Sequence, residues 1–208
     1  HLKVFYNMTI GVPYVSAENR LTVQDVLALC GSEGIGSSDP GPCSMGVDQG
    51  AHLHVTIGKR CPQKAGKIVH VNVYKNWEEL DGLMRNFNVS RAVVDAQPET
   101  RKAREFSNRW PGKVFLNYYR EQMKGPYRWD EKTMTVACNR TESLDASHGE
   151  IQLMKVILPQ ESDIMREFAT HLHNVGKDLE IDKDSGSKRY VYRRLGPDHF
   201  RHSYNYEC

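Results

Sequence analysis

Three aspartates occupy positions from which carboxylate oxygens could hold divalent metal ions. Asp48 lies in GVDQG ahead of an alternating apolar run, Asp95 ends the apolar run AVVD, and Asp198 lies in PDHFRH. Mg²⁺ and Mn²⁺ favour such ligands and often act as a pair, about 3.5–4 Å apart and bridged by one carboxylate. In such a pair, one metal activates the attacking water and the second stabilises the leaving oxygen of a phosphodiester. We predict that Asp48 is the bridge, that Asp95 completes one metal site and that Asp198 completes the other.

The same aspartates also have ordinary structural explanations. An aspartate at the end of a strand is often a turn former or a helix cap, so Asp95 could cap the helix that follows it. Asp198 could be an acid in a first helical turn, where the helix dipole favours it. His202 stands four residues after Asp198 on the same helical face, where it could be a nitrogen ligand or a neighbour of a ligand. Spacing alone leaves these alternatives open.

Clusters of basic residues could bind the phosphates of a nucleic acid without reading its sequence. Two clusters surround the turns of predicted hairpins: Lys59, Arg60, Lys64 and Lys67 in the first, and Lys188, Arg189, Arg193 and Arg194 in the second. We predict that the second hairpin lies across a DNA duplex near the metals. Gly46 and Gly50 are expected to let a DNA backbone approach Asp48 closely. A third cluster is explained equally well as a solvated helix face: Arg101, Lys102 and Arg104.

Paired histidines could in principle bind zinc. His52 and His54 stand two residues apart on a predicted strand, and His171 and His173 have the same spacing. No third and fourth ligand joins either pair at a spacing typical of a zinc site. We therefore predict that these histidines are surface residues or core residues with satisfied hydrogen bonds.

The first 120 residues predict a mixed sheet. A short helix is expected at residues 21–29 with Thr22 as its cap, followed by an irregular loop at 31–44. An antiparallel hairpin is expected from two alternating segments, 47–59 and 67–74, that RCPQKAG separates. The pattern then predicts helices at 77–87 and 99–110 and strands at 91–95 and 113–119. Strand, helix and strand in this order form a βαβ unit, which implies parallel pairing at the centre of an α/β fold.

The remaining residues predict further elements around this sheet: a strand at 133–138, a helix from Thr141, a helix at 161–172, a hairpin around 184–187 and a last helix from Pro197. The central mixed β-sheet, an antiparallel hairpin plus parallel strands, is therefore expected to be flanked by helices.

Composition is that of an ordinary globular chain. A length of 208 residues corresponds to one large domain or two small ones. The net charge of +2 is too small to establish a nucleic-acid partner by itself. Five cysteines without CxxC spacing argue against a disulfide framework and favour a reducing cytosol. No apolar run approaches the length of about 20 residues that crosses a bilayer, so no membrane partner is expected.

The motifs together resemble those of the nuclease domain of the large terminase subunit of tailed bacteriophages, which has the ribonuclease H-like fold. Five segments carry the resemblance, in the same order along nearly the whole chain: FYNMTIGVPY (5–14), GVDQG (46–50), VVDAQPE (93–99), NRTESLD (139–145) and PDHFRHSYNY (197–206). The second, third and fifth segments look like the three acidic motifs of that family. The third acid of the family lies at either of two positions one turn apart, and the later position holds His202 here.

The resemblance implies a fold, an activity and a division of the chain. It implies a leading segment at 1–44, which follows an ATPase domain, and a ribonuclease H-like nuclease domain at 45–208. No GxxxxGK[ST] phosphate loop occurs, so the ATPase motor is absent from these residues. The implied activity is a Mg²⁺- or Mn²⁺-dependent endonuclease with little sequence preference, which cuts concatemeric double-stranded viral DNA during packaging. Asp145 belongs to one of the segments, but it also fits a helix start capped by Thr141, and we favour that structural role.

The resemblance also implies partners and a location. The expected partners are double-stranded DNA, the ATPase domain of the same chain, the portal protein and the small terminase subunit. The isolated domain is expected to be monomeric and to act in the host cytoplasm, not in the mature virion. Two alternatives remain open: a non-catalytic DNA-binding or assembly module, and a junction resolvase or transposase on the same fold.

Overall fold

The computed structural model describes residues 20–62, 64–181, 186 and 188–208. The first resembling segment, residues 5–14, therefore lies outside the described residues. The described helices are α2 Val23–Leu27, α3 Trp77–Asn86, α4 Thr100–Arg109, α5 Arg140–Gln152, α6 Asp163–His173 and α7 His199–Glu207. None of them has the length and apolar composition needed to cross a membrane.

In the described residues, eight strands form one mixed sheet in the order β6-β7-β5-β4-β1-β2-β3-β8. Their bounds are β1 Cys43–Gln49, β2 Leu53–Cys61, β3 Lys64–Tyr74, β4 Val89–Asp95, β5 Val114–Tyr119, β6 Arg128–Asp130, β7 Thr135–Cys138 and β8 Val156–Ile157. Strands β1, β2 and β3 pair antiparallel, whereas β4, β5 and β7 add to β1 in parallel. The predicted combination of an antiparallel hairpin with parallel central strands is confirmed.

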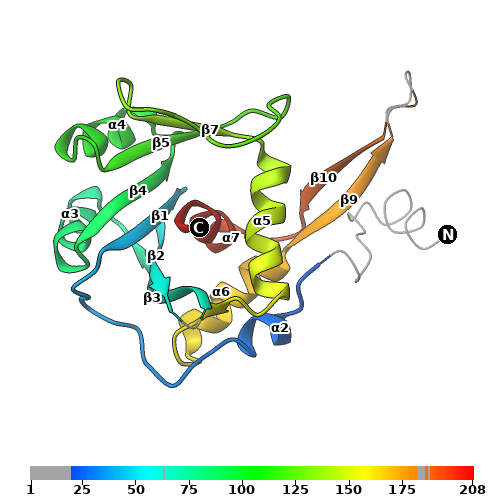
Figure 1. The fold of residues 1–208 in the computed structure, drawn as a ribbon, viewed down its shortest axis with the longest axis horizontal. Helices are drawn as coiled ribbons and strands as arrows, with labels where there is room; N and C mark the ends of the chain where they lie inside the picture. Colours follow the sequence, from blue (N-terminus) through cyan, green and yellow to red (C-terminus); the bar gives the residue numbers. More distant parts are fainter. Residues whose placement is uncertain (1–19, 63, 182–185, 187) are drawn as a thin grey trace.

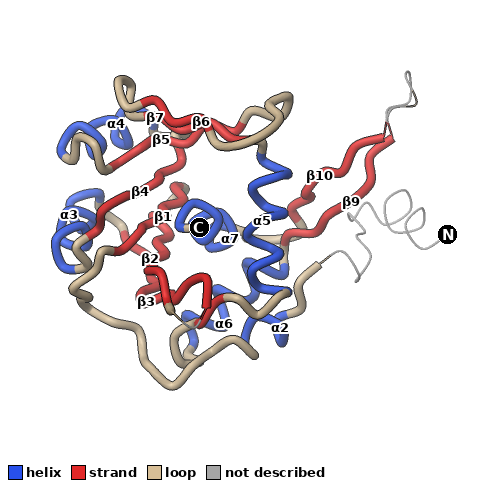
Figure 2. Tube along the Cα trace, viewed as in Figure 1, coloured by secondary structure: helices blue, strands red, loops and turns tan. Residues whose placement is uncertain are grey.

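Helices cover both faces of this sheet (Figure 1; Figure 2). On one face, α3 and α4 bury Leu80 and Phe106 against β1 and β4. On the other face, α6 and α7 bury Phe168 and Tyr204 in a second cluster. Leu21 and other apolar residues around α2 join this second cluster, so residues before 45 contribute to the core. The division into a leading segment at 1–44 and a nuclease domain at 45–208 stays a prediction.

The prediction of one continuous strand at residues 47–59 is wrong, because the chain reverses direction within this segment. Strand β1 ends at Gln49, the chain turns through residues 50–52, and β2 returns antiparallel with Asp48 opposite His54. The alternation of apolar residues continues through both strands, so a period of two does not reveal the reversal. Gly50 was the local turn signal. As a consequence, Asp48 lies at the end of a strand and not in the middle of one.

Several element ends also differ from the prediction. The capping box of α2, between Thr22 and Asp25, is confirmed. Helix α5 is capped by Asn139, whose side chain accepts the Glu142 N–H, and not by Thr141. Helix α7 begins at His199, two residues after the predicted start. Strand β6 was not predicted, because its three residues are too few to show a period.

A two-stranded hairpin, β9 Val175–Ile181 and β10 Lys188–Arg194, stands apart from the main sheet and projects from the body (Figure 1). It corresponds to the predicted second hairpin, although most of the expected turn at 184–187 lies outside the described residues.

Candidate active site

Two of the predicted aspartates lie side by side at the carboxyl ends of neighbouring strands. Strands β1 and β4 are parallel, and Val47 pairs with Val94, so Asp48 and Asp95 follow at the next position of each strand. Asp48 is 5% exposed. Burial raises the pKa of the Asp95 carboxyl, and the charge of Asp48 raises it further, against an opposing hydrogen bond from the Gln97 N–H. The structure therefore places two carboxylates where their charges repel each other.

Helix α7 crosses the same face of the sheet at very short range. A Cβ atom at Gly46 would collide with the backbone carbonyl of Ser203, and one at Gly50 would press on the ring of His199. Our prediction that a DNA backbone approaches at these glycines is therefore wrong for Gly46, which makes room for α7 instead. For Gly50, which is partly exposed, it stays a prediction.

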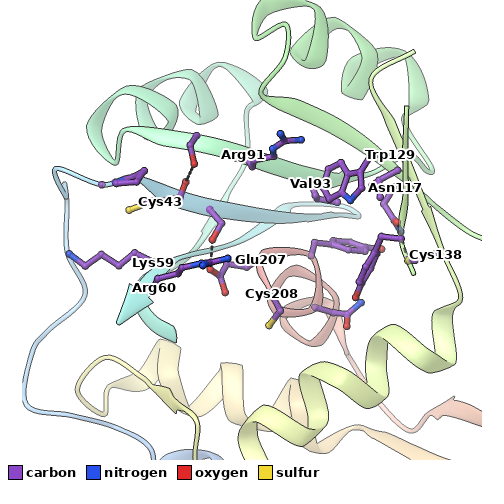
Figure 3. Close-up of a pocket in the computed structure, with 18 residues that line it drawn as sticks. Cys43, Lys59, Arg60, Arg91, Val93, Asn117, Trp129, Cys138, Glu207 and Cys208 are labelled. Atoms are coloured by element: carbon purple, nitrogen blue, oxygen red, sulfur yellow. Dashed lines mark hydrogen bonds between the residues drawn. The ribbon is translucent and has the colours of Figure 1, made fainter. Parts of the chain in front are cut away.

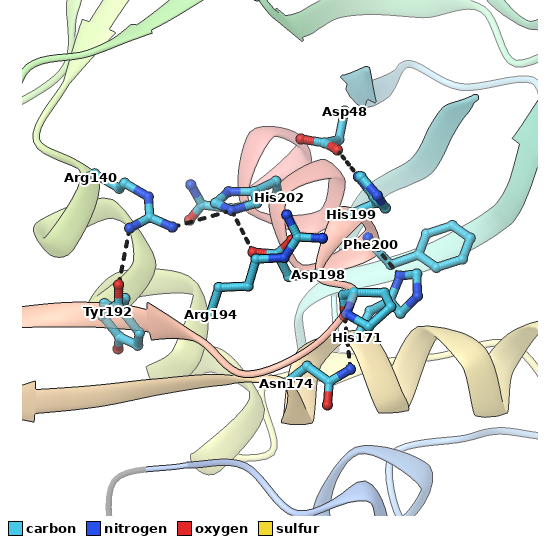
Figure 4. Close-up of polar contacts among 12 residues, drawn as sticks. Asp48, Arg140, His171, Asn174, Tyr192, Arg194, Asp198, His199, Phe200 and His202 are labelled. Atoms are coloured by element: carbon cyan, nitrogen blue, oxygen red, sulfur yellow. Dashed lines mark hydrogen bonds and ion pairs between the residues drawn. The ribbon is translucent and has the colours of Figure 1, made fainter. Parts of the chain in front are cut away.

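Each aspartate is held by a different side chain of α7. His199 Nδ1 lies 2.8 Å from Asp48 Oδ2, and His202 Nε2 lies 3.4 Å from Asp198 Oδ2 (Figure 4). The Tyr206 hydroxyl donates to Asp95 Oδ2 at 3.1 Å. Positions 199, 202 and 206 have the i, i+3, i+7 spacing of one helical face. One face of α7 therefore orients all three carboxylates.

Asp198 is the most strongly paired of the three. Besides His202, the Arg194 guanidinium lies 3.3 Å from its Oδ1. Burial alone would raise the pKa of Asp198, but the His202 hydrogen bond and the charges of His202, Arg194 and His199 outweigh it and hold the pKa below its ordinary value. Asp198 is thus ionised and N-caps α7, although its side chain makes no capping hydrogen bond.

His202 has a neighbour at each ring nitrogen. The Tyr119 hydroxyl lies 3.2 Å from Nδ1, and the Arg140 guanidinium lies 3.5 Å from Nε2. Nε2 also faces Asp198, so binding a metal through Nε2 would require His202 to release that contact. The geometry therefore favours His202 as a hydrogen-bond partner of Asp198 over His202 as a metal ligand.

The donor set fits a hard divalent cation. In the described part of the chain, neither Asp48 nor Asp95 forms an ion pair with Lys or Arg; their partners are His199, Tyr206 and the Gln97 N–H. By contrast, Asp145 receives Lys177 at 2.8 Å and the Tyr192 hydroxyl at 2.9 Å, which agrees with its predicted structural role. Adjacent carboxylates without a Lys or Arg partner are the arrangement that Mg²⁺ or Mn²⁺ neutralises.

The fold also assembles a histidine group that sequence spacing did not reveal. Ligand atoms of His54, Glu167 and His171 lie within 4.8 Å of one another, and the His54 ring stacks on His199 with centroids 4.5 Å apart. Burial lowers the pKa of both His54 and His171 to about 4. His54 is a core residue, one of the two predicted alternatives, but its Nδ1 has no hydrogen-bond partner among the described residues, so the expectation of satisfied hydrogen bonds is wrong for this residue.

His171 is explained best as a helix cap. Its Nδ1 accepts the backbone N–H of Phe200 at 3.3 Å, in the first turn of α7 (Figure 4). The proton of the neutral ring therefore resides on Nε2, which faces Glu167 at 3.8 Å. A metal at Nε2 would have to displace this proton while Nδ1 still accepts a hydrogen bond, which is an unfavourable state for imidazole.

Most of the predicted DNA-binding residues are already in ion pairs. Lys59 binds Asp39, Arg189 binds Glu180, Arg193 binds Asp178 and Glu180, and Arg194 binds Asp198. Arg60 and Lys188 are exposed and have no such partner in the described part of the chain. Arg140, which sequence reasoning missed, lies beside His202 at the candidate site.

Solved structures similar to this chain include nucleases of phage large terminases. The large terminase nuclease of thermophilic phage G20c with bound magnesium aligns over 92% of this chain and 97% of that chain at 13% identity, with a TM-score of 0.57. A mutant nuclease domain of the large terminase subunit gp2 of bacterial virus Sf6, with manganese and beta-thujaplicinol, aligns over 90% and 99% at 7% identity, with a TM-score of 0.59. No protein-family model and no curated protein matches the chain.

A third structure, the large terminase of another thermophilic bacteriophage, is 13% identical with a TM-score of 0.52. This chain aligns over 98% of its own residues but spans only 48% of that terminase. The chain therefore has the fold of phage large terminase nuclease domains, and the predicted ribonuclease H-like fold is confirmed.

Proposed function

We propose that this chain is a metal-dependent DNA endonuclease, the nuclease domain of a large terminase subunit, which cuts concatemeric double-stranded DNA during genome packaging. The observation that carries the proposal is the set of contacts from one face of α7 to Asp48, Asp95 and Asp198. These contacts gather three carboxylates on a fold shared with nucleases whose structures contain magnesium or manganese.

Two divalent cations, Mg²⁺ or Mn²⁺, would lower the pKa of an attacking water and neutralise charge on the scissile phosphate. Asp48 would be shared between them, with Asp95 at one site and Asp198 at the other. His199 fixes the orientation of Asp48 through Oδ2, and Tyr206 does the same for Asp95. Arg140, whose guanidinium lies 3.5 Å from His202 Nε2, would contact a phosphate oxygen of the substrate.

DNA would bind through its phosphates, with little sequence preference. Lys188 on the projecting hairpin and Arg60 are the predicted cations without an ion pair in the described residues, whereas the other four would have to exchange an acidic partner for a phosphate. Isolated, the domain is proposed to be monomeric and to bind DNA weakly.

The wider assignment follows from the same proposal. An ATPase domain would precede the leading segment at 1–44, and residues 45–208 would form the nuclease domain. The portal protein and the small terminase subunit would be partners, and the site of action would be the host cytoplasm.

The proposal is tested by incubating supercoiled plasmid with the purified chain and Mg²⁺ or Mn²⁺. We expect nicking and linearisation by the parent chain and loss of both in Asp48→Asn and Asp95→Asn. Asp163→Asn, at an exposed position in the first turn of α6, is the matched surface control and should cut normally. Asp145→Asn should also cut. Intact plasmid with both metals in the parent chain would overturn the assignment.

One observation favours the alternative of a non-catalytic DNA-binding or assembly module. Asp198 is paired with Arg194, and the position one turn later holds a histidine, so the third metal ligand is the least available of the three. Normal cleavage by Asp198→Asn would show that Asp198 is not a required metal ligand. Inactivity of the parent chain and of every variant would support the non-catalytic module. Preference for branched over linear duplex would favour a junction resolvase.

A further inference from the structure

A cavity of about 600 Å³ lies between the last turn of α7 and the sheet face formed by β1, β4, β5 and β7 (Figure 3). Its volume falls within the range of small-molecule sites. Proposed catalysis does not use it, because Asp48, Asp95 and Asp198 are not among the residues that line it.

The cavity runs along the sheet from the amino ends of β1 and β4 to Asn117, which pairs with Asp95. Cys43 and Ser90 line it at the amino ends of β1 and β4, and Arg60 lines it at the carboxyl end of the antiparallel strand β2. The carboxylates lie at the other ends of β1 and β4. Tyr206 belongs to both places, because it lines the cavity and donates to Asp95.

A hydrogen-bond donor without a partner lies on the cavity wall. Asn117 on β5 is 2% exposed and lines the cavity. Its Oδ1 accepts the Cys138 thiol at 3.4 Å, but its Nδ2 has no hydrogen-bond partner in the described residues. A buried amide N–H without an acceptor is destabilising, and such groups in native proteins usually indicate a bound water or ligand. The wall therefore offers a donor to a ligand acceptor.

Two partly exposed aromatic rings line the same cavity as this donor. Tyr127 is 45% exposed and Trp129 is 44% exposed, and both line the cavity. The Arg91 guanidinium lies 5.2 Å from the centroid of the Trp129 ring, which holds the ring in place (Figure 3). Exposed aromatic rings of this kind stack on planar aromatic ligands such as nucleobases.

Cations gather at the mouth. Arg60 on β2 and Arg91 on β4 lie on either side of β1, and neither forms an ion pair in the described part of the chain. Glu207 is the acidic residue among the lining residues, and its Oε1 accepts the Ser44 hydroxyl at 2.6 Å. Burial raises the pKa of Glu207 to about 7, so its carboxyl is partly neutral at neutral pH. The mouth therefore favours an anionic group.

The spacing of these features matches one ligand class. Asn117 on β5 pairs with Asp95, which is four residues after Arg91 on β4. The Cα atoms of Arg91 and Asn117 are therefore about 13 Å apart along the strand direction. A nucleotide spans a distance of this order between the edge of its base and its phosphate. We propose that the cavity binds a nucleoside monophosphate, with the base against Tyr127 and Trp129, an acceptor of the base at Asn117, and the phosphate at the mouth that Arg60 and Arg91 line.

The test is calorimetric titration of the whole chain with dAMP, without divalent metal. Binding should weaken about tenfold or more in Arg91→Gln and in Trp129→Ala, because each removes a charged contact or a stacking surface. Asn117→Val should also weaken binding, while Arg101→Gln, an exposed arginine on α4, is the matched control and should bind normally. Adenosine and inorganic phosphate should each bind at least about tenfold more weakly than dAMP.

The proposal of a nucleotide site and the proposal of a nuclease activity can be refuted independently of each other. Asp48→Asn should lose DNA cleavage but bind dAMP like the parent chain. Competition by a short single-stranded oligonucleotide distinguishes the two sources of the ligand: displacement of dAMP assigns the cavity to the end of a DNA strand, and no displacement assigns it to free nucleotide. Absence of dAMP binding, equal affinity for adenosine, or unchanged affinity in Trp129→Ala and Asn117→Val would each overturn the proposal.

Discussion

His199 Nδ1 donates to Asp48 Oδ2 at 2.8 Å, and the same histidine ring stacks on His54, the residue opposite Asp48 on the neighbouring strand. The contact raises the pKa of His199, because the hydrogen bond and the charge of Asp48 favour the imidazolium. One oxygen of Asp48 is thereby engaged by the protein, so the other oxygen would be the one that the two proposed cations share.

The first prediction concerns this positioning role. His199→Ala should weaken DNA cleavage by about 10- to 100-fold, the usual effect of removing a hydrogen-bond partner of a metal-binding side chain. The half-saturating Mn²⁺ concentration should rise as well, because Asp48 would no longer be oriented. The measurement is cleavage rate against Mn²⁺ concentration.

The control for this change is His52→Ala, which removes an exposed histidine from the turn between β1 and β2. It should leave both parameters unchanged. A His199→Ala enzyme with the parent half-saturating Mn²⁺ concentration would show that His199 does not position Asp48.

A second prediction follows from Tyr206. Burial and the charge of Asp48 raise the pKa of Asp95, and the hydrogen bond from the Tyr206 hydroxyl opposes that rise. Tyr206→Phe keeps the ring but removes the donor, so the pKa of Asp95 should rise further. The acid limb of the pH profile of cleavage should therefore move to higher pH, because Asp95 must be ionised to bind a cation.

Tyr190→Phe, on the exposed hairpin strand β10, is the comparison for loss of a phenol hydroxyl. It should leave the acid limb in place. An unchanged acid limb in Tyr206→Phe would disprove the coupling between Tyr206 and Asp95.

The strands and helices around Asp95 could be predicted from sequence because their signals are local. Short apolar runs mark β4 and β5, and the helical spacing of Leu80, Leu83 and Met84 marks α3. Those signals also placed Asp95 at a strand end next to a helix. The parallel pairing of β1 with β4, which makes Asp48 and Asp95 neighbours, does not follow from that βαβ unit, because the unit joins β4 to β5 through α4.

The rest of the site depends on contacts between distant segments. His199 is 151 residues from Asp48 along the chain, and Tyr206 is 111 residues from Asp95. Only the contact between His202 and Asp198 is local within this set. Nothing local in HFRHSYNY shows which of its residues faces the sheet, because apolar and polar residues mix along the helix. The roles of His199 and Tyr206 could have been inferred from their spacing of seven residues only once Asp48 and Asp95 were known to be neighbours.

A third prediction tests the close approach of α7. Gly46→Ala places a Cβ against the carbonyl of Ser203, which is backbone and cannot swing aside. The substitution should destabilise the fold by about 1–3 kcal/mol, as overpacking usually does, or shift α7 and reduce cleavage. Chemical denaturation measures the first effect, and the plasmid assay measures the second.

Gly149→Ala provides the contrast, because this glycine lies within α5 and an added Cβ meets no atom within 4 Å. Alanine in a helix interior should stabilise the chain by about 0.5–1 kcal/mol. Equal stability of Gly46→Ala and the parent chain would mean that α7 does not pack on β1 as closely as described.

The fourth prediction uses Glu207, whose pKa burial raises from 4.5 to about 7. Because the folded pKa lies above the unfolded one, the stability that Glu207 contributes is complete below about pH 4.5 and is lost as pH rises through 7. The loss should be of the order of 2 kcal/mol, reduced by solvent screening. Urea denaturation from pH 4.5 to 8 should therefore show a steeper decline in the parent chain than in Glu207→Gln, and parallel curves would contradict the raised pKa.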